Sequence, residues 1–338
     1  MPYFKVYFAV LRLVFTNVLI WTMIRAFVLP DYSQIKVDSY EELPEWNNFI
    51  WIDIQNGSAQ DIISIEEKFK ISFPSKQQQE EIEVSSRYSE EDEAIKIITR
   101  FINFLPQSEK IEDSDVSIIV KDNVILTNRN FESRVFQEIV RKIKQQPSHY
   151  NHALKILIAI LEQGIDNDAD IIEFLSAKIN ALSKSSTFSA PTDEKLILKI
   201  NFYQEAMIKV REDLFDTQRV LSLLIRNEVI KDENLEKIRM LLKDIASLID
   251  HTSFNFTRLE FLQNSFLGLI NIEQNKIIKI FTVVSVIFMP PTLIASIYGM
   301  NFKNFPELDW TWGYPFALLL MVLSTLIILY IFRKKKWL

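Results

Sequence analysis

Two long uncharged runs near the C-terminus most constrain what this chain can fold into. The first covers residues 280–302 and the second covers residues 310–332, so each contains 23 residues without a charged side chain. A helix rises about 1.5 Å per residue, so each run is long enough to cross a hydrocarbon core about 30 Å thick. We therefore predict two transmembrane helices, at 277–299 and 313–332, joined by an external loop at 300–312.

The charges that flank these runs predict their orientation. Lys276 and Lys279 precede the first span, and a basic tail at 333–338 follows the second. Basic residues collect on the cytosolic side of a membrane. We therefore expect a multi-pass protein of the cell inner (plasma) membrane with both termini in the cytosol. The loop acids Glu307 and Asp309 would then lie outside and raise the local concentration of cations.

One face of the first span is polar enough to line a pore. Its members recur at helical spacing: Asn275, Ile278, Thr282, Ser285, Met289, Thr292 and Ser296. Two helices cannot enclose an aqueous path, so a pore would require several copies of the chain. In such a ring Ile278 and Met289 would form hydrophobic constrictions. The alternative is that these residues are helix–helix packing positions.

The loop that follows the first span offers neutral oxygens to a cation. Gly299 permits a tight turn with close backbone approach. Asn301 and the Gly299 carbonyl could contact a hydrated cation without removing its water. The first span contains no charged residue that could bind a proton. A divalent ion entering a negative cell gains about 4.6 kcal/mol at about 100 mV, so a voltage-driven passive path suffices.

The chain before the spans predicts an α/β domain at 23–147. Residues 49–54 and 95–104 are apolar and β-branched enough for strands. Residues 117–127 contain two short apolar runs about a polar turn, which is typical of a hairpin.

Long helices follow, as a helical bundle and stalk at 148–276. Residues 192–289 contain no proline and only one glycine, and a heptad seam of apolar residues runs from Leu196 to Leu224. A stalk helix is expected from about Asn234 to Tyr298. Residues 1–22 form an uncertain N-terminal extension, for which we favour a translation start at Met23 over a surface-lying apolar helix.

Composition excludes several classes of function. The chain has no cysteine, so disulfides, thiolate metal sites and cysteine catalysis are excluded. A net charge of −6 argues against binding nucleic acid, which normally requires a basic face. Five glycines in 338 residues argue against a phosphate-cradling loop. Since no nucleophile–base pair stands out either, we do not expect an enzyme.

The motifs around the spans resemble those of the CorA family of divalent-cation (magnesium/cobalt) transporters. The segments that carry this resemblance are Tyr298-Gly299-Met300-Asn301-Phe302, Pro306-Glu307-Leu308 and Gly313-Tyr314-Pro315. The upstream run Asn271-Ile272-Glu273-Gln274-Asn275 is similar to the enteric-type subgroup. The resemblance covers residues 213–338 well and is loose before them. It implies a CorA-like fold, with an α/β cytosolic domain, a long α-helical stalk and two C-terminal transmembrane helices.

The resemblance also implies how such a chain works. It implies a homopentamer in the lipid bilayer, with the first span lining the pore. The transported ion would be Mg²⁺, with cobalt and nickel as further ions, and cytosolic Mg²⁺ would close the pore. Gly299, Met300 and Asn301 would form the selectivity filter, while Glu81 and Asp244 would hold a regulatory metal ion.

Two other functions remain open at this point. A zinc transporter of the same fold also carries Gly-Met-Asn, although Pro290-Pro291 and the Asn271–Asn275 run favour the magnesium branch. A membrane-anchored scaffold protein without transport would need neither a polar pore face nor Asn301.

Overall fold

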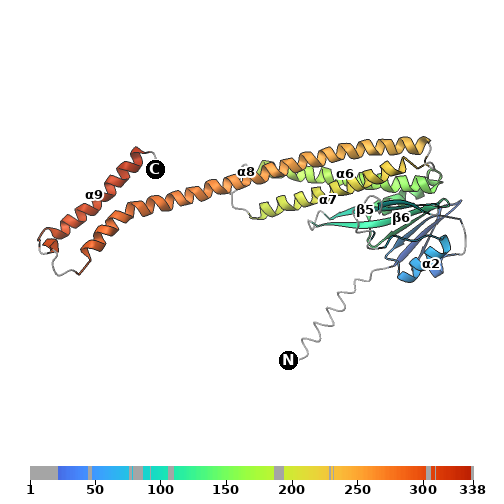
Figure 1. Ribbon diagram of the computed structural model, residues 1–338, viewed down its shortest axis with the longest axis horizontal. Helices are drawn as coiled ribbons and strands as arrows, with labels where there is room; N and C mark the ends of the chain where they lie inside the picture. The colour runs from blue at the N-terminus through green and yellow to red at the C-terminus, as the bar shows by residue number, and fades with distance from the viewer. Residues whose placement is uncertain are drawn as a thin grey trace, which may run out of the picture. The chain divides into compact units, whose positions relative to one another are not determined.

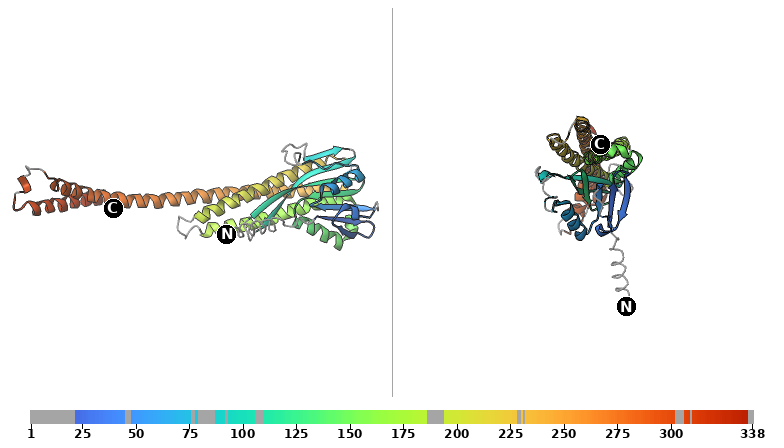
Figure 2. Two further views of the ribbon diagram at one scale, coloured as in Figure 1. Left: turned by 90° about the horizontal axis from the view of Figure 1, so that it is seen from below. Right: turned by 90° about the vertical axis from the view of Figure 1, so that its right-hand side faces the viewer.

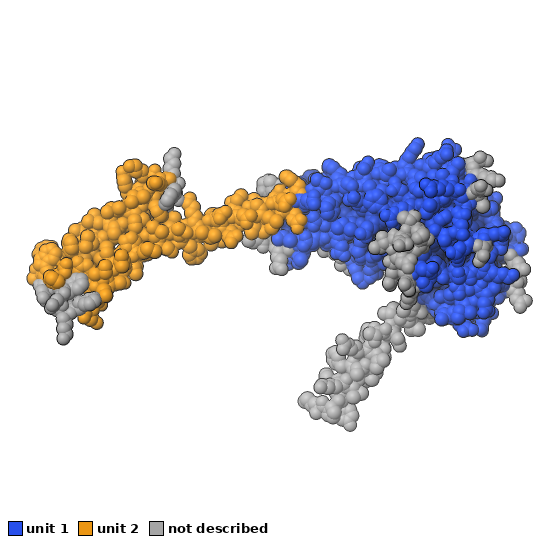
Figure 3. Space-filling model, viewed as in Figure 1, with its two compact units in different colours: residues 1–187, 195–260 blue, residues 188–194, 261–338 orange. Residues whose placement is uncertain are grey.

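The structure is a computed structural model, and it describes residues 22–44, 48–75, 78, 87–91, 93–105, 110–185, 194–227, 230, 232–301, 306–308 and 310–335. These residues form two compact units (Figure 3). Unit 1 comprises residues 1–187 and 195–260, and unit 2 comprises residues 188–194 and 261–338. Residues 1–21 of the predicted extension, Glu81 and Asp309 lie outside the described residues.

Unit 1 is built on a seven-stranded mixed sheet with the order β2-β1-β3-β7-β6-β5-β4. The strands are β1 (Met23–Val28), β2 (Ser33–Val37), β3 (Phe49–Gln55), β4 (Tyr88–Glu91), β5 (Ala94–Leu105), β6 (Lys110–Lys121) and β7 (Val124–Arg129). All neighbours are antiparallel except β3 and β7, which run parallel from Trp51↔Ile125 to Gln55↔Arg129. Every residue of β3 is buried, because both faces of the sheet are covered there.

The predicted hairpin is confirmed by β6 and β7. Asp122 and Asn123 form its two-residue turn, and both have a positive φ, 48° and 63°. A type I′ turn requires this backbone at both central positions, and Asn and Asp tolerate it better than most residues.

Helices cover the two faces of the sheet (Figures 1 and 2). On one face α2 (Ala59–Phe69) places Ile65 against Ile52 and Ile54, next to the short helix η1 (Tyr40–Glu42). On the other face α5 (Arg134–Gln145) places the Phe136 ring 6.3 Å from Trp51 and 5.6 Å from Phe101. The short helix η2 (Pro147–Tyr150) leads from α5 into α6.

The predicted long helices are present. They are α6 (Ala153–Ser185), α7 (Glu194–Leu224), α8 (Asp232–Tyr298) and α9 (Gly313–Lys334). The heptad seam of α7 is buried from Ile200 onward, at Ile200, Tyr203, Met207, Val210, Leu214, Thr217, Leu221 and Leu224. The stalk prediction agrees with α8 to within two residues at its start and matches its last residue.

Candidate functional site

Unit 2 contains two described helical segments with exposed apolar side chains. α8 and α9 are both long and apolar enough to cross a membrane. In the most apolar stretch of α8 no residue is buried, and in that of α9 only 11% are. Apolar surface this continuous is unusual on a protein surrounded by water. These helices therefore need lipid or other protein around them.

The polar face predicted for the first span is uncovered in the single chain. All seven predicted pore residues are exposed: Asn275, Ile278, Thr282, Ser285, Met289, Thr292 and Ser296. The two apolar members are among the more exposed, with Ile278 at 53% and Met289 at 67%. We call these seven residues the polar seam. If these residues were packing positions within one chain, they would be buried.

The opposite side of α8 is half-buried. Its members are Val283, Ile287, Pro290, Ile294 and Tyr298. Successive helical residues differ by about 100°, which places this stripe roughly 150° around the helix from the polar seam. In the same unit α9 has a covered stripe of its own, at Gly313, Ala317, Met321, Ile328 and Phe332. The two stripes indicate that α9 covers the side of α8 away from the seam.

Two hydroxyl groups of the seam are held within the helix. Thr282 Oγ1 donates to the Ile278 carbonyl at 2.8 Å, and Thr292 Oγ1 donates to the Phe288 carbonyl at 2.7 Å. A hydroxyl that donates in this way keeps its lone pairs free as acceptors. The seam can therefore present oxygen lone pairs to a cation or to its water.

The Gly-Met-Asn segment lies where α8 ends. The Gly299 amide still donates to the Ala295 carbonyl at 2.9 Å, and the Met300 amide donates to Ile297 at 3.2 Å. The expected tight turn is not a left-handed one, since no described glycine has a positive φ. A Cβ at Gly299 would lie 3.2 Å from the Ala295 oxygen, a tight contact within the last turn of the helix. Asn301 is exposed at the end of the helix.

The loop acid Glu307 is positioned by the start of α9. It lies in the short helix η3 (Pro306–Leu308) and is exposed. A Cβ added to Gly313 would lie only 2.1 Å from the Glu307 carbonyl oxygen, so no other residue fits without moving that backbone. The Gly313 amide donates to the Trp310 carbonyl at 2.9 Å. These contacts hold the loop between α8 and α9 against the first turn of α9.

The predicted regulatory residue Asp244 is exposed on α8 in unit 1. Near it on α6 lies an acidic row with i, i+4 spacing, Glu162, Asp166 and Asp170. Partial burial raises the pKa of Asp166; Lys142 opposes this, and the carboxylates of Glu162, Asp170 and Asp244 add to it. Within the described part of the chain, no three His, Asp or Glu side chains are grouped closely enough to hold a metal ion.

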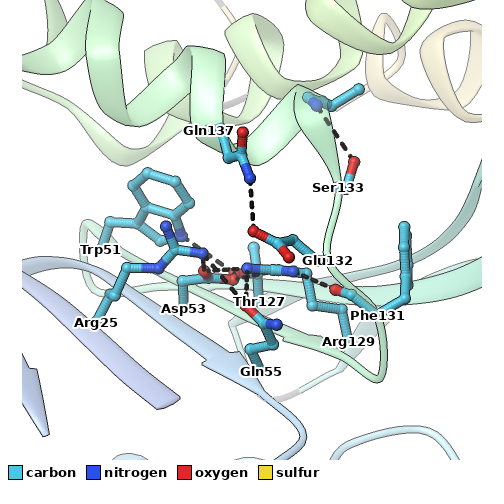
Figure 4. Close-up of polar contacts among 11 residues, drawn as sticks. Arg25, Trp51, Asp53, Gln55, Thr127, Arg129, Phe131, Glu132, Ser133 and Gln137 are labelled. Carbon is cyan, nitrogen blue, oxygen red and sulfur yellow. Dashed lines mark hydrogen bonds and ion pairs between the residues drawn. The ribbon is translucent and has the colours of Figure 1, made fainter. Parts of the chain in front are cut away.

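A buried polar cluster in unit 1 is a structural feature rather than a ligand site (Figure 4). Both oxygens of Asp53 are engaged: Oδ1 accepts from Thr127 at 2.8 Å and from Arg129 Nε at 3.0 Å, and Oδ2 accepts from Arg129 Nη2 at 3.0 Å. Arg25 Nη2 lies 3.1 Å from the same Oδ2. The fully engaged carboxylate leaves no free oxygen for a ligand.

Comparison with known proteins decides the family. The family described as CorA-like Mg²⁺ transporter protein matches residues 46–334. The chain belongs to this family. This assignment covers most of the sheet, all four long helices and the loop between α8 and α9, and it confirms the resemblance drawn from the three C-terminal motifs.

Curated CorA relatives match along nearly their whole length. The magnesium transport protein CorA of Wolinella succinogenes is 39% identical over 295 residues, which are 86% of this chain and 92% of the relative. The magnesium transport protein CorA of Escherichia coli K12 is 34% identical over 318 residues, 94% of this chain and 100% of the relative. The solved structure of the CorA magnesium transporter from Methanocaldococcus jannaschii has the same fold, with a TM-score of 0.72 at 24% identity, covering 94% of this chain and 98% of that one.

Sequence reasoning missed two features of this CorA-family chain. The acidic row on α6 has a visible signal, since Glu162, Asp166 and Asp170 repeat every four residues. The close packing of Gly313 on Glu307 has no signal in the local pattern, because it depends on how the loop returns to the helix.

Proposed function

We propose that this chain carries Mg²⁺ across a membrane through a pore made by several copies, with the polar seam of α8 as its wall. The observation that carries this proposal is the seam itself, which is exposed and has a side-chain oxygen at five of its seven positions. The magnesium transport named for its curated relatives supports the choice of ion.

The proposed assembly is a homopentamer in the lipid bilayer. A single α8–α9 pair cannot enclose water, and α9 covers only the side of α8 away from the seam. A symmetric ring of α8 helices would turn each seam inward and leave α9 to face lipid. Ile278 and Met289 would then narrow the path at two levels and could gate it by dewetting.

Ion selection is assigned to Gly299, Met300 and Asn301. Mg²⁺ binds its water tightly, so an entry site works best by contacting the hydrated ion with neutral oxygens. A ring of Asn301 carboxamides, exposed at the ends of the α8 helices, offers such oxygens. Glu307 and Asp309 would raise the cation concentration in front of it. Cobalt and nickel, as divalent ions of similar hydration, are expected as further substrates.

The driving force is the membrane potential. We place the protein in the inner (plasma) membrane with both termini in the cytosol, since basic residues flank the spans at Lys276, Lys279 and Arg333 to Lys336. A divalent ion then gains about 4.6 kcal/mol on entry at about 100 mV. This gain is sufficient without ATP or a coupled proton.

Regulation by cytosolic Mg²⁺ is assigned to Asp244 and Glu81 at contacts between copies. Asp244 is exposed. The described residues of one chain contain no group of three His, Asp or Glu side chains that could hold a metal ion. A regulatory site at Asp244 would therefore take ligands from a neighbouring copy or from outside the described residues. Binding there at high cytosolic Mg²⁺ would hold the pore closed.

The test is Mg²⁺ uptake into liposomes that contain the purified full chain and an internal indicator. We expect Asn301→Ala to lower uptake at least about tenfold, which corresponds to the loss of about 1.4 kcal/mol of stabilisation for the entering ion. Asn151→Ala, which removes an exposed carboxamide in unit 1, is the matched control and should leave uptake unchanged.

Three outcomes decide against parts of the proposal. Uptake of Zn²⁺ without Mg²⁺ would assign the chain to zinc transport. Uptake that ignores an imposed potential would exclude the voltage-driven path. Absence of uptake of either ion by folded, oligomeric protein would favour a membrane-anchored scaffold.

A further inference from the structure

Two aspartates are buried against each other between the long helices of unit 1. Asp168 lies on α6 and Asp213 lies on α7, and each is only 2% exposed. Their carboxyl groups are within hydrogen-bonding reach of each other. Neither the Asp168 Oδ1 nor the Asp213 Oδ1 atom has a donor among the described groups. The transport proposal makes no use of this pair.

Ionised carboxylates only accept hydrogen bonds, so two of them side by side need a proton to form one. Burial raises the pKa of Asp168 well above its usual range, and the neighbouring charge and hydrogen bond of Asp213 act in the same direction. Burial also raises the pKa of Asp213. Two neighbouring buried carboxyl groups cannot both remain ionised, because their negative charges repel each other. The pair therefore titrates as a unit that shares a proton.

Charged groups from three elements face Asp213. They are Asp216 on α7, Arg100 on β5 and Asp113 on β6. Arg100 Nε lies 3.5 Å from both Asp113 and Asp115, and Lys209 on α7 donates to Asp113 at 2.8 Å. The charge of Arg100 is shared with the carboxylates of β6, so it lowers the pKa of Asp213 but does not cancel the effect of burial.

A proton fits this site better than a metal ion does. Mg²⁺ requires about six oxygen ligands in octahedral geometry. The pair offers two carboxyl groups, and the described residues contain no third His, Asp or Glu placed to complete a metal site. A shared proton lets the two carboxyl groups form a hydrogen bond with each other without any further ligand.

We propose that Asp168 and Asp213 form a proton-binding site that joins α6 to α7 and makes the packing of unit 1 depend on pH. With the proton bound, one carboxyl group donates a hydrogen bond to the other and so links the two helices. When the proton leaves, the second negative charge repels the first in a buried site, and α6 and α7 separate. Raising the pH would thus loosen the helices that lie on β5 and β6.

The direction of the pH effect follows from linkage. The folded chain holds a proton that the unfolded chain releases near the ordinary aspartate pKa of 3.8. The stabilisation by the shared proton is therefore fully present below pH 3.8. It is lost as the pH rises through the raised pKa of the pair in the folded chain.

The experiment measures thermal unfolding of the full chain in detergent between about pH 5 and about pH 9. Asp168→Asn supplies a permanent N–H donor, so its melting temperature should fall less with pH than that of wild type, by roughly 2–4 °C. Glu173→Gln, an exposed change five residues along α6, is the matched control and should keep the wild-type slope. An equal slope in wild type and Asp168→Asn would overturn the proposal.

A second measurement covers the case in which Asp168→Asn does not fold. The infrared spectrum of the wild type at neutral pH should contain the carbonyl stretch of a protonated carboxylic acid, shifted in heavy water. The double variant Asp168→Asn/Asp213→Asn, which has neither carboxyl group, should lose this band. A wild-type spectrum without the band, or a band that the double variant retains, would overturn the proposal whatever the melting curves show.

Discussion

The polar cluster around Asp53 in unit 1 is buried, whereas the polar seam in unit 2 is exposed. In unit 1 the carboxylate of Asp53 is fully buried and is surrounded by donors from Thr127, Arg129 and Arg25. In unit 2 the polar groups of the seam are exposed, while large apolar side chains beside them, such as Phe281 and Phe288, are exposed as well. The polar cluster of unit 1 therefore has its partners within one chain, whereas the exposed side chains of unit 2 fit the proposed assembly in a membrane.

This difference separates the expected effects of mutation. A change to a buried polar group of unit 1 removes a partner that nothing else can replace, so it lowers the free energy of unfolding. A polar change in the seam removes an exposed side chain that contacts only solvent or its own helix in the single chain, so it should leave folding intact and alter transport.

The largest effect is expected for Asp53→Ala. It leaves Arg25 and Arg129 buried without their carboxylate, which costs about 3–5 kcal/mol when one partner of a buried ion pair is removed. Denaturant unfolding of the full chain measures this loss. Asp38→Ala, an exposed aspartate of the same unit, should change stability by less than about 0.5 kcal/mol. Equal stability of the two variants would contradict the structural assignment of the cluster.

Gly313→Ala should act on transport rather than on unit 1. Its Cβ would lie 2.1 Å from the Glu307 carbonyl, so the outer loop must move away from α9. We expect Mg²⁺ uptake to fall on the order of tenfold, equivalent to about 1.4 kcal/mol of lost positioning, while unfolding of unit 1 is unchanged.

The control for Gly313→Ala is Gly268→Ala. A Cβ at Gly268 meets nothing within 4 Å, and the residue lies within α8. This change should stabilise the helix by roughly 1 kcal/mol and leave uptake as in the wild type. If both variants lost uptake equally, the loop contact would not be the cause.

The smallest effect is expected for Thr282→Val, which keeps the shape of the side chain and removes the seam hydroxyl. Uptake should fall about two- to tenfold, the range for losing one hydrogen bond of about 0.5–1.5 kcal/mol. Thr325→Val is the matched control, because Thr325 Oγ1 donates to Met321 in the same manner on α9, outside the seam. Equal losses in the two variants would mean that the seam does not line the path.

Much of the secondary structure could be predicted because it depends on residues close together in the chain. The heptad spacing of α7 predicted the buried face from Ile200 to Leu224, and the polar turn at Asp122 and Asn123 predicted the β6–β7 hairpin. The exposure of the seam agrees with its predicted face, while its role in a pore remains a prediction. Glu81 and Asp309 lie outside the described residues, so their predicted roles also remain predictions.

The sequence by itself determined the two apolar helices, the long stalk, the motifs at Gly299 to Asn301 and thereby the family. The length of an apolar run, the periodicity of apolar residues and short motifs are local properties, because each depends on residues close together in the chain. Only the tertiary structure decided that β3 pairs in parallel with β7, that Asp53 meets Arg129, that Asp168 meets Asp213, and that Glu307 packs on Gly313. The aspartate contacts join residues on different strands or helices, and the loop contact depends on a backbone path, so each arises from how the elements pack and leaves no periodic mark in the sequence.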